Sequence, residues 1–276
     1  AGFFVSYLYR SINAVIGPDL ARDFGLSPAG LGLLSGIFFF SFALFQLPLG
    51  VLLDRYGARR VQTGLLLVAA AGSLALAIAQ SFATLFAARA VIGLGFSAGL
   101  MASYKSSSVW VPLHRRSLAN AMIMSMGALG LVIATEPTAL AVAAYGWRTV
   151  FMALAAIIAV SAAFIFFAVP EHPATQAAPA PLAQQWQELW AILRLPLFWR
   201  VAPLLGISAG IPIAYQTLWA GPWLRDVAGL ARPDVARVLF WMAVSFMVGI
   251  LLVGIVADRL QKRGIGPMQT LMGFLV

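Results

Sequence analysis

The chain has 276 residues, of which 62% are hydrophobic and only 10% are charged. A soluble domain is about half apolar and about a quarter charged, so this composition excludes an ordinary soluble protein and favours a lipid bilayer as the surroundings. The net charge of +9 would suit a nucleic-acid-binding protein, but the basic residues fall in short loops between apolar runs, where they set membrane topology, so no nucleic-acid partner is predicted.

Eight apolar segments are long enough to cross a bilayer as helices, since a helix needs about 20 residues to span the hydrocarbon core. They cover residues 2–20, 31–53, 61–79, 85–111, 118–144, 149–169, 201–220 and 238–257. A ninth begins near Pro267, and the chain starts and ends inside apolar runs, so we expect the polypeptide to be truncated at both ends. The runs are too long and alternate too little for strands, so the predicted class is an all-α membrane protein.

The loops between these segments differ in basic charge, which predicts the orientation of the chain in the membrane. One side carries Arg55, Arg59, Arg60, Arg115, Arg116, Arg194, Arg200, Arg259, Lys262 and Arg263. The other side carries Arg22, Arg148, Arg225, Arg232 and Arg237. The more basic side is expected to be cytoplasmic, with the N-terminus inside. The Ala-, Gly- and Arg-rich composition suggests a bacterial inner membrane.

One connection is unlike the other loops. Residues 170–200 begin rich in proline and alanine, as linkers do, and then place Trp186, Leu189, Trp190 and Leu193 at helical spacing. This pattern predicts a short amphipathic helix on the cytoplasmic surface. It divides a six-helix bundle at 1–169 from a partial C-terminal bundle at 201–276.

A loop motif follows the second segment, where Gly50 precedes Asp54 and Arg55 at fixed spacing and Gly57, Arg59 and Arg60 come after. It resembles the signature of the major facilitator superfamily, a family of secondary transporters. Gly50 would let a neighbouring helix approach, and Asp54 would pair with an arginine or cap a helix. The pattern returns after the eighth segment as Gly254, Asp258 and Arg259, without the inner glycine. A six-helix repeat predicts this second copy.

Weaker features agree with the same family. Arg89 with Gly93 and Gly95 opens the fourth segment in the way typical of the family, and Gly146-Trp147-Arg148 precedes the sixth. The fifth segment keeps Pro137 but lacks the glycines that surround it in antiporters. The resemblance implies twelve helices working by alternating access. It also implies a gating role for the motif residues: Gly50, Asp54, Arg55, Gly57, Arg59, Arg89, Gly254, Asp258 and Arg259.

Four charges lie inside apolar segments, and such charges usually face a cavity and serve a function. The first is Arg10, which shares one face of its helix with Ser6, Asn13 and Gly17. As a substrate residue it would bind an anion through two parallel hydrogen bonds, whereas as a structural residue it would pair with Glu136 or a helix C-terminus. Some organic-anion and sugar-phosphate transporters of the family resemble this chain in having an arginine in helix one.

The other three charges leave alternatives open. Lys105, which follows Tyr104, either binds substrate or extends to the cytoplasmic interface. Arg89 and Lys105 would point about 160° apart on a straight helix. Both would face a cavity only if the intervening glycines allow a bend, so Arg89 is expected to be structural or gating. Glu136 beside Pro137 either carries a coupling proton or forms a salt bridge with Arg10 or Arg148.

The seventh segment contains Pro203, Gly206, Gly210 and Pro212, which make a helix easy to bend. Tyr215 and Trp219 lie on one stripe with Gln216 alongside, so these three are candidates for a substrate wall, although aromatic residues at this spacing usually only pack. The predicted substrate contacts are therefore Arg10, Asn13, Tyr104, Lys105, Tyr215, Gln216 and Trp219.

Other chemistry has little support. The two histidines lack metal-ligand spacing, there is no cysteine, and no phosphate-binding glycine loop is present, so we predict no metal, no cofactor, no ATP drive and no enzyme. The interpretation is a monomeric, proton-coupled transporter of a small organic anion. A proton-coupled efflux antiporter of drugs or metabolites is the second hypothesis, and a transporter-like sensor or transport-dead fragment is the third.

Overall fold

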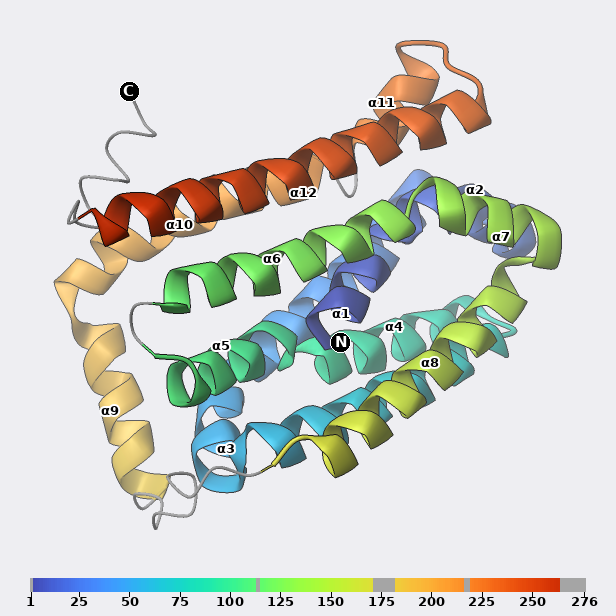
Figure 1. Cartoon of the computed structure of the whole chain (residues 1–276). Helices are drawn as coiled ribbons and strands as arrows, with labels where there is room; N and C mark the ends of the chain where they lie inside the picture. Colours follow the sequence, from blue (N-terminus) through green and yellow to red (C-terminus); the bar gives the residue numbers. More distant parts are fainter. Residues whose placement is uncertain (1, 113–114, 171–181, 216–218, 264–276) are drawn as a thin grey trace.

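The computed structural model describes residues 2–112, 115–170, 182–215 and 219–263, and within these ranges every regular element is a helix (Figure 1). The helices are α1 (Gly2–Ser11), α2 (Asn13–Phe24), α3 (Pro28–Ala77), α4 (Phe82–Phe96), α5 (Gly99–Trp110), α6 (Arg116–Ile133), α7 (Glu136–Tyr145), α8 (Trp147–Ala168), α9 (Leu182–Arg194), α10 (Pro196–Ala214), α11 (Ala220–Asp226) and α12 (Arg232–Lys262). The all-α prediction is thus confirmed.

Five helical stretches in the described part are long and apolar enough to cross a membrane. They are Pro28–Ala77, Phe82–Trp110, Arg116–Ile133, Trp147–Ala168 and Arg232–Leu260. The first is 50 residues long and contains Gly57 at φ 78° and ψ 159°, where two helices meet in a sharp turn. These two helices correspond to the second and third predicted segments. With several stretches that can cross a membrane, the chain is a multi-pass membrane protein.

Three predicted segments are each interrupted once in the structure, at Ile12, at residues 97–98 and at residues 134–135. The third break has a clear cause, because Pro137 has no N–H to donate to Ile133. The Thr138 hydroxyl donates to the Ile133 carbonyl oxygen instead, at 2.6 Å. The break at 97–98 separates α4 from α5 and lies beyond Gly93 and Gly95, so those two glycines are not the site of a bend.

Helices α1, α3, α4 and α8 enclose the main buried core, which includes Tyr9, Phe38, Ile92 and Phe151. Close packing explains the two glycines of α4. A Cβ atom at Gly93 would lie 2.2 Å from the Phe38 carbonyl oxygen, and one at Gly95 would lie 2.5 Å from the Ala69 nitrogen. Small residues let helix backbones approach in this way in membrane proteins.

The later helices contact the earlier ones mainly through α12, which lies along α6 (Figure 1). A Cβ atom at Gly254 would lie 2.3 Å from the Ala121 Cβ atom, so the two helices touch there. Helix α9 falls in the predicted linker, whose residues 171–181 lie outside the described ranges, as do the side chains of Trp186 and Leu189. The division into bundles at 1–169 and 201–276 stays a prediction.

Candidate functional site

Arg10 in the last turn of α1 is held between aromatic rings rather than by a carboxylate. Its guanidinium carbon lies 4.4 Å from the centre of the Phe42 ring and 5.1 Å from that of Tyr7. Its Nε atom is buried and has no hydrogen-bond partner, and no described residue forms an ion pair with the side chain. The salt bridge to Glu136, one of the two roles considered for Arg10, is therefore not formed within the described ranges.

The polar face of α1 and α2 has two kinds of residue. Ser6 and Arg10, one turn apart, both have a buried polar atom that no group in the described ranges satisfies. Asn13 is instead engaged at both ends of its amide, because its Oδ1 accepts from Arg89 Nη2 and its Nδ2 donates to the Ser35 hydroxyl at 3.0 Å. The face thus offers unpaired donors near Arg10 and a fixed amide at Asn13.

Arg89 on α4 is fully buried, and its side chain contacts α2 and α8. Its hydrogen bond to Asn13 connects α4 to α2, and its guanidinium carbon lies 5.7 Å from the Phe151 ring centre. Its Nε and Nη1 atoms have no hydrogen-bond partner in the part of the chain that the structure describes. A buried charge is costly unless it is compensated. The fully enclosed position of Arg89 therefore suits a residue that holds helices together.

Lys105 and Asp54 form an ion pair that the sequence pattern did not indicate. The Lys105 Nζ atom lies 2.5 Å from Asp54 Oδ1 and also donates to the Leu53 carbonyl oxygen at 2.7 Å. Asp54 was expected to pair with an arginine or cap a helix, so its observed partner corrects that expectation. Tyr104, next to Lys105, is half-buried on α5, which packs against α1.

The motif glycines behave differently from one another. Gly57 occupies the turn of α3 at a positive φ angle that residues with a Cβ atom rarely adopt. Nothing lies within 4 Å of a Cβ atom built on Gly50, so the close approach expected there is not seen in the described part of the chain. At Gly254, in the second copy, the close approach is present.

The charged residues of the two loop motifs differ in exposure: Asp54, Arg55 and Arg259 are exposed, Arg59 is half-buried and Asp258 is buried. Arg55 packs over the Tyr56 ring at 5.7 Å, and Arg59 donates to the Val169 carbonyl oxygen at 3.3 Å. Asp258 is buried, whereas Arg259 beside it is exposed. The first copy of the motif is therefore tied to α5 through Asp54 and to the end of α8 through Arg59.

Among the described residues, neither Glu136 nor the aromatic residues of the seventh segment contact Arg10. Glu136 is half-buried in the first turn of α7 and makes no side-chain hydrogen bond or ion pair with any described residue. Tyr215 and Trp219 are exposed, at 49% and 66%, and no described ring contact joins either to Arg10. Gln216 lies outside the described residues.

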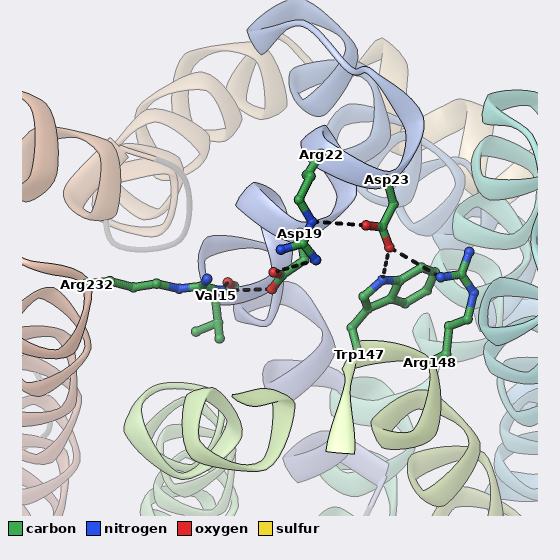
Figure 2. Close-up of polar contacts among 7 residues, drawn as sticks. All are labelled: Val15, Asp19, Arg22, Asp23, Trp147, Arg148 and Arg232. Carbon is green, nitrogen blue, oxygen red and sulfur yellow. Dashed lines mark hydrogen bonds and ion pairs between the residues drawn. The ribbon is translucent and has the colours of Figure 1, made fainter. Parts of the chain in front are cut away.

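A second polar cluster joins α2 to the starts of α8 and α12 and was missed by the sequence analysis (Figure 2). Asp23 accepts from the Trp147 indole at 2.9 Å and from Arg148 at 3.3 Å, and Asp19 pairs with Arg232 at 2.8 Å. The hydrogen bond from Trp147, followed by Arg22 and Arg148, lowers the pKa of Asp23 below its ordinary value. The arginines of this cluster, Arg22, Arg148 and Arg232, all come from loops that the sequence analysis assigned to the same side of the membrane. That shared side was the sequence feature that could have predicted the cluster.

Comparison with known proteins gives consistent matches. The sequence model of the Major Facilitator Superfamily matches residues 1–276. A probable sulfoacetate transporter of Cupriavidus necator is 24% identical over 282 residues, which cover 95% of this chain and 64% of that protein. The hexuronate transporter of Bacillus subtilis is 24% identical over 265 residues, which cover 94% of this chain and 63% of that protein.

The fold also matches a solved structure. A bacterial homologue of the human lysosomal transporter Spinster, in an inward-facing and unoccupied conformation, has a TM-score of 0.69 at 19% identity. The match covers 95% of this chain and 61% of that one. The chain therefore spans less than two thirds of the length of each of these three proteins.

Proposed function

The chain belongs to the major facilitator superfamily over its whole length, and from this we propose that it forms part of a secondary transporter that works by alternating access. In this mechanism the helices before residue 170 and those after residue 200 rock against each other around a central substrate site. The family assignment agrees with the expectation that the chain is not an enzyme. A small-molecule substrate follows from the same proposal.

We propose that the substrate is a small organic anion, such as a carboxylate or sulfonate. The observation that carries this proposal is Arg10, a cation without a carboxylate partner among the described residues, with a buried and unsatisfied Nε atom. A guanidinium group binds carboxylate, sulfonate and phosphate oxygens through paired hydrogen bonds, and it does so more strongly where water is excluded. Ser6, one turn away, adds a further unpaired hydroxyl.

The names of the relatives support the same substrate class. One is a probable sulfoacetate transporter and another is a hexuronate transporter, and both substrates are small anions. Within the predicted substrate set, Lys105 is engaged by Asp54 and Asn13 by Arg89, whereas Arg10 contacts only the rings of Tyr7 and Phe42, which lie outside that set. We therefore place the anion against Arg10 and assign Lys105 to gating in the conformation described here.

We further propose that Glu136 carries the coupling proton. It is an ionisable residue at the start of α7 whose carboxylate has no cationic partner among the described residues. Arg148, which was considered as its partner, is bound to Asp23 instead. Ionisable residues inside membrane segments commonly serve proton relays, and Glu136 is not occupied by a structural salt bridge in the described part.

The anion proposal is tested by ligand-induced thermal stabilisation of the purified protein in detergent. The probes are sulfoacetate, glucuronate, a phosphate ester and a lipophilic cation, applied to the wild type, to Arg10→Gln and to Arg10→Lys. A ligand at a hundred times its dissociation constant stabilises the folded state by about 2.7 kcal/mol. We expect an anion to stabilise the wild type and to have no such effect on Arg10→Gln. Part of the stabilisation should remain in Arg10→Lys, which keeps the positive charge but lacks the planar guanidinium group.

Arg225→Gln is the matched control, because Arg225 is an exposed arginine paired with its neighbour Asp226 at 2.6 Å. It should leave anion stabilisation unchanged. Stabilisation by the lipophilic cation alone, equal in wild type and Arg10→Gln, would instead favour the efflux antiporter. Ligand binding without uptake into proteoliposomes would favour the sensor.

A further inference from the structure

The polar cluster at the end of the molecule away from the cytoplasmic motif has two parts that differ in what they connect (Figure 2). One part joins elements that precede residue 170. Asp23 at the end of α2 accepts from Trp147 and Arg148 at the start of α8, and Arg148 also donates to the Ala79 carbonyl oxygen at 3.3 Å. This part fastens α2 to α8 and to the end of α3.

The other part joins the early helices to the late ones. Arg232, the first residue of α12, donates to Asp19 Oδ2 at 2.8 Å and to the Val15 carbonyl oxygen at 3.2 Å. The Asp19 side chain is only 10% exposed. The two residues are 213 positions apart in the chain, so this bond exists only while the first residue of α12 stays within reach of α2.

We propose that the Asp19–Arg232 pair is a latch that closes this end of the molecule and that opens when α12 moves away from α2. The inference rests on the proposed alternating-access function and adds the residues that hold one of its two states. Asp23 and Trp147 keep α2 fixed on α8 during this movement, so that α12 departs as the mobile side.

Arg22 explains how the latch opens without leaving a buried carboxylate alone. It lies 3.5 Å from Asp19 Oδ1 and 3.3 Å from Asp23 Oδ1, so it bridges the two parts of the cluster. Removing one partner from a buried charge pair is costly mainly because the other charge is left uncompensated. Arg22 stays close to Asp19 when Arg232 leaves. The Asp19 carboxylate therefore keeps a positively charged neighbour after the latch opens.

The chain contains no cysteine, so single reporter cysteines can be introduced without a background. Val15→Cys on α2 and Ala236→Cys on α12 suit this purpose, because both side chains are 7% exposed beside the latch. A membrane-impermeant maleimide applied from the predicted extracytoplasmic side reports how often this end opens. We expect slow labelling with the latch intact, and labelling about fivefold faster or more in Arg232→Gln and Asp19→Asn.

Three variants make the test specific. Arg232→Lys keeps the cation and should label slowly. Arg237→Gln removes an arginine on the same helix that pairs with Asp234, and should also label slowly. Asp23→Asn weakens the part that fastens α2 to α8 but leaves the Asp19–Arg232 bond in place, so it should lower thermal stability without accelerating labelling.

Unchanged labelling of both reporters in Asp19→Asn and Arg232→Gln would overturn the latch. If Arg232→Gln does not fold, Asp19→Asn decides the matter, because it removes the same bond from the other side. The labelling needs no ligand, so it separates the two proposals. Faster labelling in the latch variants of a protein that does not transport would support the latch and reject the transport function. Transport together with unchanged labelling would support the transport function and reject the latch.

Discussion

Two arginines inside apolar segments, Arg10 and Arg89, show what can and cannot be predicted from sequence for a single side chain. Both were identified from sequence because charges are rare in apolar runs. Their surroundings differ in the structure: Arg89 is fully enclosed and bonded to Asn13, whereas Arg10 lies between the Phe42 and Tyr7 rings with an unsatisfied Nε atom. Sequence spacing along one helix gives the face of a residue, but it does not reveal partners on other helices, such as Phe42 for Arg10 and Asn13 for Arg89.

The ion pair of Lys105 and Asp54 gives a prediction at the same scale. The two side chains are 24% and 66% exposed, so we expect a coupling energy of only about 0.5 kcal/mol in a double-mutant cycle. The cycle uses Lys105→Met, Asp54→Asn and the double variant, measured by thermal unfolding. Lys105→Met should also leave anion stabilisation intact. A loss of ligand stabilisation equal to that in Arg10→Gln would return Lys105 to the substrate site.

A pH dependence follows from Asp23. The Trp147 indole, Arg22 and Arg148 lower its pKa in the folded protein. A carboxyl with a lowered folded pKa stabilises the protein above its unfolded pKa of about 3.9, and this contribution is lost as the pH falls through the folded value. We expect Asp23→Asn to lower the free energy of unfolding by about 1 kcal/mol at neutral pH.

Melting curves of the wild type and of Asp23→Asn, recorded between neutral pH and the lowest pH the protein tolerates, check this prediction. The difference between the two melting temperatures should shrink on acidification below about pH 4, because both proteins then carry a neutral side chain at position 23. A difference independent of pH would mean that Asp23 stabilises through shape or neutral hydrogen bonds. Asp234→Asn, at an exposed i,i+3 pair, serves as the control.

At the scale of the helices, the sequence predicts their existence better than their continuity. Apolar runs locate most of the membrane helices, because a length of about 20 residues is demanded by the bilayer itself. The interruption at residues 134–135 depends on Pro137 and on the Thr138 hydroxyl taking over the Ile133 carbonyl oxygen. Such local exchanges of hydrogen-bond partners leave hydropathy unchanged, so the run reads as one segment.

The two glycines of the first motif give a prediction for helix α3. Gly57→Ala places a Cβ atom on a residue at φ 78° and ψ 159°, a region that only glycine occupies readily, so it should cost about 1–3 kcal/mol. Gly50→Ala is the matched control, since its surroundings are open and alanine favours a helix by up to about 1 kcal/mol. Thermal unfolding of both variants should show opposite signs. Equal effects would show that the turn at Gly57 relaxes.

At the scale of the whole molecule, the two motif copies predict a repeat, and the match over residues 1–276 confirms the family. What could not be predicted is where the early and late helices touch. The Asp19–Arg232 pair and the approach of Gly254 to Ala121 both join residues more than a hundred positions apart. Such contacts depend on how whole helices pack, and neither hydropathy nor loop charge encodes a partner at that separation.

The contact between α12 and α6 is tested by exchanging one Cβ atom across it. In Gly254→Ala the new Cβ atom would meet the Ala121 Cβ atom at 2.3 Å, so the helices must separate. Overpacking of this kind costs about 1–3 kcal/mol. Gly249→Ala on the same helix meets nothing within 4 Å and should be neutral or stabilising. The double variant Gly254→Ala with Ala121→Gly moves the glycine across the interface and should recover most of the lost stability.

The readouts are thermal unfolding and labelling of Ala236→Cys in each background. Because α12 also carries Arg232, separation at Gly254 should strain the latch and speed labelling, and the double variant should slow it again. Rescue of both stability and labelling would show that α12 moves as one rigid element from Gly254 to Arg232. Rescue of stability without any change in labelling would show that α12 bends between the two contacts, because the far end then does not follow the near one.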